Sequence, residues 1–115
     1  MDNIKFHYLY RDGSNYKKWG DVIFSNETKL RTVSIVSDLR RHFLEDGLFI
    51  AHQIRIPNVF LTDDYSHTED DHCYHEFDTA ESTSEPVSDA YRRSIENFID
   101  EVARESKRGW QAFLV

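Results

Sequence analysis

The N-terminal residues alternate between apolar and polar side chains, and this pattern restricts the fold more than any other. Apolar residues occupy every second position at Ile4, Phe6, Tyr8 and Tyr10. Because successive side chains of a strand point to opposite faces, the alternation predicts a strand over residues 3–11 with one face on a core. The next residues favour a chain reversal, and they are Asp12, Gly13, Ser14 and Asn15. We therefore expect a hairpin that returns through Trp19 to Ser25.

Two other segments have the three-to-four-residue apolar spacing of amphipathic helices. The first is expected to end at Gly47, and its spaced positions are Val33, Val36, Leu39, Arg40 and Phe43. The second is predicted to begin with Ser88 as N-cap and to end at Gly109. Its core positions are Tyr91, Ile95, Phe98, Ile99 and Val102.

The residues between and after these helices complete the predicted sheet. Residues 48–61 are apolar and β-branched but contain Pro57, which favours two short strands or a bent one. Residues 72–78 read as a strand with Cys73, His75 and Phe77 on one face, followed by a polar connector over 79–87. Residues 110–115 are expected as an edge strand or a packed arm. The fold class is α+β: an antiparallel or mixed sheet of about five to six strands with two helices packed on one face, in the order ββα, two to three strands, αβ.

All of the net charge lies in residues 63–78, DDYSHTEDDHCYHEFD. This stretch holds seven acids and no Lys or Arg, so the rest of the chain has fourteen acids against fourteen bases and the net charge is −7. It also holds three of the six histidines and the only cysteine, Cys73. We expect residues 63–71 to be an exposed acidic loop, where electrostatic recognition would take place.

Size and composition limit the class of protein. A chain of 115 residues supports one hydrophobic core, so we predict a single domain over residues 1–115. No apolar run approaches the ~20 residues that span a bilayer, and the N-terminus lacks the pattern of a signal peptide. We therefore expect a cytoplasmic protein with no membrane contact. One cysteine forms no intramolecular disulfide.

Several segments resemble a family of small bacterial proteins of unknown function. They are the hairpin YRDGSNYKKWG, the VIFSN that follows, the DGLFIAHQ after the first helix, and DHCYHEFD. The resemblance covers roughly residues 4–100 and implies no activity, cofactor or partner. It differs at Cys73-Tyr74, where the family pattern favours a nearby tryptophan.

Metal and thiol chemistry are both disfavoured by the pattern around Cys73. On a strand, His72 and His75 point to opposite faces, and no metal-ligand motif such as CxxC or HExxH is present. A neighbourhood of carboxylates raises the pKa of a thiol rather than lowering it. We expect no metal and no cofactor, with His75 as a core histidine and Cys73 as a buried, inert side chain. Acid–base chemistry by Glu76 with Asp71 or Asp78 stays open, although acids are too abundant here for a pair to be specific.

The hairpin tip combines aromatic and basic side chains, as recognition surfaces often do. The alternative is a twisted hairpin whose aromatic residues pack on its own sheet. Direct nucleic-acid binding is disfavoured by the net negative charge. The paired arginines Arg40-Arg41 and Arg92-Arg93 are expected on solvated helix faces.

Two hypotheses for the function follow. The first is a small binding protein of the inhibitor, immunity or nucleic-acid-mimic type, whose acidic 63–71 loop meets a protein with a basic surface. The second is a small enzyme or ligand-binding domain with a site between the 10–19 hairpin and residues 71–76. The protein would be a monomer, or a dimer through a sheet edge. The candidate binding residues are Tyr10, Arg11, Asn15, Tyr16, Lys17, Trp19, Asp63, Asp64, Glu69, Asp70, Asp71, His72, His75 and Glu76.

Overall fold

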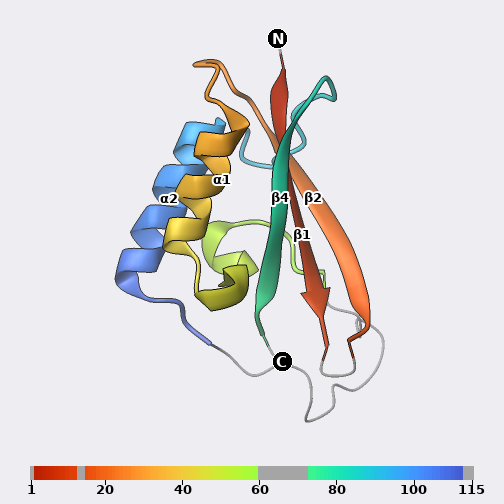
Figure 1. Ribbon diagram of the computed structural model, residues 1–115, viewed down its shortest axis with the longest axis vertical. Helices are drawn as coiled ribbons and strands as arrows, with labels where there is room; N and C mark the ends of the chain where they lie inside the picture. Colours follow the sequence, from red (N-terminus) through yellow and green to blue (C-terminus); the bar gives the residue numbers. More distant parts are fainter. Residues whose placement is uncertain (1, 13–14, 60–72, 113–115) are drawn as a thin grey trace.

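A curled, antiparallel sheet of four strands forms a half-barrel (Figure 1). The computed structural model describes residues 2–12, 15–59 and 73–112, and the four strands lie within these ranges. In space their order is β2-β1-β4-β3. Their bounds are Asn3–Arg11 for β1, Lys17–Phe24 for β2, Leu48–Phe49 for β3 and His75–Thr83 for β4. The predicted hairpin of β1 and β2 is confirmed, with Ile4 opposite Phe24 and Arg11 opposite Lys17.

Two helices lie on the same side of this sheet (Figure 1). Helix α1 spans Thr32–His42 and α2 spans Ile95–Arg108, while two 3₁₀ turns flank β3, η1 at Glu45–Gly47 and η2 at Ala51–Ile54. No helix in the described part of the chain is long and apolar enough to cross a membrane. The α+β class is therefore confirmed, in the order ββαββα.

Aromatic rings fill the space between the sheet and the helices. Phe6 of β1 is fully buried at its centre. Its ring centroid lies 5.2 Å from that of Phe77 on β4 and 5.1 Å from that of Phe98 on α2. Because the even-numbered residues of β1 all face this core, the alternation seen in the sequence sets the orientation of the whole strand.

Within the described residues the sheet has four strands, fewer than the five to six predicted for the whole chain. After β3 the chain forms η2 and then a left-handed residue, Arg55 with φ of 57°, which ends any extended run. Residues 110–112 form no strand. The alternative prediction for this segment was a packed arm. Trp110 agrees with it, because this residue packs against the core and its Nε1 donates to the carbonyl of His42.

Strand β4 begins later and ends later than predicted. Cys73, His75 and Phe77 share the inward face as expected, but residues 79–83, predicted as a connector, continue the strand. Tyr8 pairs with Phe77 and His7 pairs with Thr79, so Asp78 has no partner on β1. Because of this β-bulge, the next inward-facing residue after Phe77 is Ala80, three positions later, instead of residue 79. The two-residue alternation of a strand is therefore interrupted in the sequence.

Both helices are shorter than predicted. Helix α1 ends at His42, and Gly47, with φ of 76°, closes the separate turn η1. Helix α2 begins after Ser94, whose hydroxyl accepts from the backbone N–H of Asn97. Ser88 has another role, because its Oγ accepts from the N–H of Ile23 on β2. Tyr91, predicted in the core, is consequently 55% exposed.

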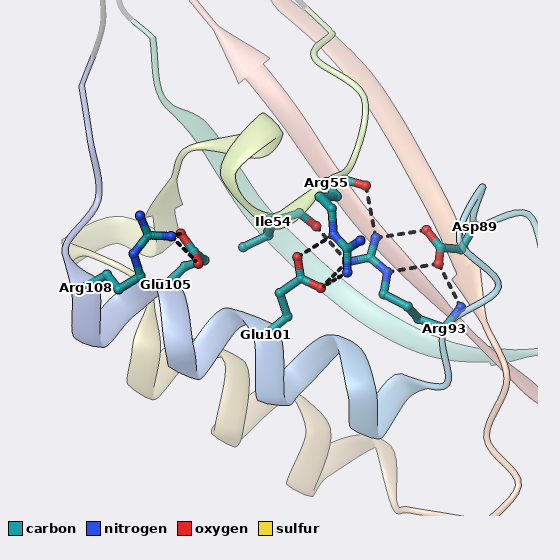
Figure 2. A network of polar contacts seen from close by, with 7 residues as sticks. All are labelled: Ile54, Arg55, Asp89, Arg93, Glu101, Glu105 and Arg108. Carbon is teal, nitrogen blue, oxygen red and sulfur yellow. Dashed lines mark hydrogen bonds and ion pairs between the residues drawn. The ribbon is translucent and has the colours of Figure 1, made fainter.

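The segment before α2 holds a buried arginine, Arg93, which was predicted to be solvated (Figure 2). Its side chain is only 6% exposed. It makes paired hydrogen bonds of 2.9 Å to Asp89 and one of 3.1 Å to Glu101. It also donates to the carbonyls of Ile54 and Arg55 at 2.8 and 3.0 Å. These bonds satisfy the guanidinium and tie α2 to the chain after η2.

The two carboxylates of this network are stabilised in their charged forms. Burial raises the pKa of Asp89, but hydrogen bonds from Arg93 outweigh it, so the pKa lies below the ordinary value. The pKa of Glu101 is lowered chiefly by its hydrogen bonds from Arg55, at 2.7 and 2.6 Å. The folded state is therefore stabilised when both groups are ionised.

This dependence predicts acid sensitivity. Because both folded-state pKa values are depressed, the unfolded chain takes up protons first, and the free energy of unfolding should fall as pH drops below about 4. Glu101→Gln should lower stability at neutral pH and flatten this decline. Urea unfolding across acidic pH measures both effects. Asp100→Asn, at the preceding position, which is exposed, is the control, and an equal slope in the two variants would contradict the assignment.

Candidate functional site

The hairpin closes through hydrogen bonds centred on Asp12. The N–H of Asp12 donates to the carbonyl of Tyr16 at 3.0 Å, and the Asp12 carboxylate accepts from the N–H of Tyr16 at 2.9 Å. Asn15 has a φ of 68°, a conformation that asparagine tolerates well. The turn therefore holds the end of β1 in a defined position.

A bidentate ion pair joins the hairpin to β4. Arg11 donates through Nε and Nη2 to the two oxygens of Glu76, at 3.3 and 3.2 Å. The hydrogen bond with Glu76 raises the pKa of Arg11, and Nη1 of Arg11 also donates to Asn15. The second hypothesis required the hairpin and residues 71–76 to be adjacent, and this ion pair brings them into contact at Arg11 and Glu76.

A cleft of about 630 Å³ opens beside this ion pair. This volume is within the range of small-molecule sites. The cleft combines the ends of β1 and β4 with residues from α1, η1 and β3. The described residues that line it are Arg11, Asp12, Arg40, Asp46, Leu48, Tyr74 and Glu76.

Arg40 is held at the wall of the cleft by two contacts with β4. Its Nη2 donates to the carbonyl of Asp78 at 3.2 Å, and its guanidinium lies 4.9 Å from the centre of the Phe77 ring. Next to it, the turn η1 packs closely on β4, since a Cβ added to Gly47 would lie 3.4 Å from the Phe77 carbonyl. Arg40 is exposed, in agreement with its prediction on a solvated helix face, and that prediction did not include it in a site.

The lining residues can recognise charge but contain no complete catalytic arrangement. Two guanidinium groups and three carboxylates surround one phenol and one leucine. Among these described residues no thiol or imidazole is present that could act as a nucleophile or base. The chemistry of the cleft therefore favours binding of a polar ligand that carries both charges.

Two of the predicted site residues face the core. Tyr10 is 1% exposed and His75 is fully buried, and their rings lie 5.6 Å apart. Strand alternation explains this, because both residues occupy inward positions. The side chains of Tyr10 and His75 therefore point away from the cleft.

The predicted residues of the hairpin tip are accessible. Tyr16 is 70% exposed and Trp19 is 57% exposed, and Asn15 and Lys17 are exposed as well. Arg11 and Glu76 are partly exposed in the cleft. The other predicted residues lie outside the described part of the chain: Asp63, Asp64, Glu69, Asp70, Asp71 and His72.

His75 fixes the chain on both sides of residues 60–72. The N–H of Val59 donates to His75 Nε2 at 2.9 Å, which requires the neutral ring with its proton on Nδ1. Val59 also packs so close to Gly20 that a Cβ on Gly20 would lie 2.9 Å from Val59 Cγ1. Val59, the last described residue before this range, is thus hydrogen-bonded to the first residue of β4.

Among residues 2–12, 15–59 and 73–112, no group of three His, Cys, Asp or Glu side chains could hold a metal ion. Cys73 is a buried free thiol. Comparisons with protein-family models, curated proteins and solved structures find no match to this chain. The family resemblance of the hairpin and of DHCYHEFD stays a prediction.

The position of His75 predicts its effect on stability. His75→Ala should lower the free energy of unfolding by about 2–4 kcal/mol, because it leaves a cavity and removes the acceptor for the Val59 N–H. His75→Gln keeps a polar acceptor and should cost less. Urea denaturation followed by circular dichroism measures both. Unchanged stability in His75→Ala would contradict the proposed anchor.

Proposed function

We propose that this protein is a small binding protein that recognises a partner protein with a basic surface through the acidic segment 63–71, together with the cleft at Arg11 and Glu76. The observation that carries the proposal is the hydrogen bond between Val59 and His75, which fixes both flanks of a segment that holds five of the seven excess acids. A charged segment with fixed ends loses less conformational freedom on binding than a free chain does.

The carboxylates of the cleft support the same partner chemistry. Asp46 is exposed on η1, and Asp12 and Glu76 also line the cleft. Two residues that line the cleft, Tyr74 and Glu76, follow the acidic segment closely in the sequence. Lysine and arginine side chains of a partner would meet negative charge from both sources, which favours rapid and specific association.

Local neutralisation of charge tests this proposal. A variant with Asp63, Asp64, Glu69, Asp70 and Asp71 changed to Asn or Gln should bind its captured partner at least about tenfold more weakly, and the remaining binding should depend less on salt. Affinity capture from cell extract identifies the partner, and calorimetry at two salt concentrations measures the affinity.

A matched control separates local charge from net charge. Five exposed acids elsewhere can be neutralised together: Asp2, Glu27, Glu45, Glu96 and Asp100. This variant has the same net charge as the first but should retain the affinity of the wild-type protein. Equal binding by all three proteins would remove the basis of the proposal.

A second candidate function is binding of a small zwitterionic ligand, such as an amino acid or a short peptide, in the cleft. It is favoured by the opposed charges of Arg40 and Asp46 on the cleft lining. Titration with amino acids and dipeptides should shift the amide resonances of Asp46, Leu48 and Tyr74. Arg40→Gln should abolish these shifts while leaving the circular dichroism spectrum unchanged. No shift with any such compound would exclude this function.

A further inference from the structure

The outer edge of β2 has a sequence that is complementary to itself. In the described sheet β2 pairs with β1 and forms one edge (Figure 1). Its first five residues are Lys17, Lys18, Trp19, Gly20 and Asp21. A basic residue and an acidic residue thus lie two positions on either side of an exposed tryptophan.

The hydrogen bonds at Ile23 show which backbone groups of β2 point outward. The N–H of Ile23 donates to Ser88 Oγ at 2.8 Å, and its carbonyl accepts from the N–H of Ser88 at 3.0 Å. The backbone N–H and carbonyl of Ile23 therefore both point away from β1. Because the direction alternates along an antiparallel strand, the backbone groups of Lys17, Trp19 and Asp21 also point away from β1.

Among the described residues, Ser88 bonds to this edge at Ile23, and its two bonds do not extend to the outward backbone groups of Lys17, Trp19 and Asp21. An added strand would have to match the outward groups at 17, 19 and 21. We propose that a second copy of this chain docks there, β2 against β2 and antiparallel, with Trp19 opposite Trp19 of the second copy. This register is the only one centred on Trp19, and it pairs outward groups with outward groups.

The same register aligns the side chains favourably. It sets Lys17 of each copy opposite Asp21 of the other, so two cross-strand ion pairs form. Three residue pairs would exchange about six backbone hydrogen bonds. Trp19 already lies opposite Leu9, which is 1% exposed. The two copies would therefore form one apolar row across a continuous sheet, Leu9-Trp19-Trp19-Leu9.

Lysines on an edge strand can also serve to prevent pairing between sheets. In the proposed register, however, Lys17 meets an acid rather than another lysine. Lys18 lies on the opposite face of the strand from Trp19. Repulsion between lysines is thus avoided at the position where it would matter most, which favours a second copy over an unrelated strand.

Charge exchange tests the register directly. Sedimentation equilibrium of the full chain up to millimolar concentration should show a reversible monomer–dimer equilibrium. Asp21→Lys and Lys17→Asp should each weaken dimerisation by about tenfold or more, because each change places two like-charged pairs opposite each other. The double variant Lys17→Asp/Asp21→Lys should restore the wild-type dissociation constant.

Backbone substitution gives an independent readout. Trp19→Pro removes an N–H that β1 does not use, so the monomer should keep its fold while dimerisation is lost. Trp19→Ala, which retains the N–H, should dimerise more strongly than Trp19→Pro. A wild-type chain that is monomeric at every concentration, or a double variant that fails to recover dimerisation, would overturn the proposal. These outcomes are independent of the acidic segment.

Discussion

The fold depends on the ring of Phe6. This residue lies at the middle of β1, the strand that pairs with both β2 and β4. Its ring packs against aromatic residues from strands, a helix and the segment after α1, and these are Tyr8, Phe43, Phe49, Phe77 and Phe98. The rings of the described residues that contact Phe6 come from β1, β3, β4, α2 and the residue after α1, and none comes from β2. Aromatic burial of this kind supplies both hydrophobic free energy and preferred geometry.

The features of the fold that could be predicted are those that depend on local periodicity. The alternation around Phe6 and the spacing from Ile95 to Val102 each point at a single core, and both were interpreted correctly. The errors came from contacts that periodicity does not encode. Ser88 resembles an N-cap in sequence, but its hydroxyl binds the backbone of Ile23, and the burial of Arg93 requires carbonyl groups from a distant part of the chain.

The candidate site illustrates the same limit. The sequence pointed to the hairpin tip and to Glu76, and Arg11 does bind Glu76. It could not indicate Arg40 or Asp46, because these residues come from separate segments that only the packing of η1 on β4 brings to the cleft. The role of His75 was ambiguous for a simpler reason. A histidine that holds the chain and a histidine that binds a ligand can occupy the same position in an alternating strand sequence.

The bulge at Asp78 divides β4 into two parts with different neighbours. Residues before it pair with the end of β1 and connect to the acidic stretch, whereas Thr79–Thr83 pair with the beginning of β1 and complete the core. Because Asp78 has no partner on β1, a shift in one part need not be passed to the other. A displacement of the part of β4 before the bulge would thus be taken up at a single residue, and the part that completes the core would keep its position.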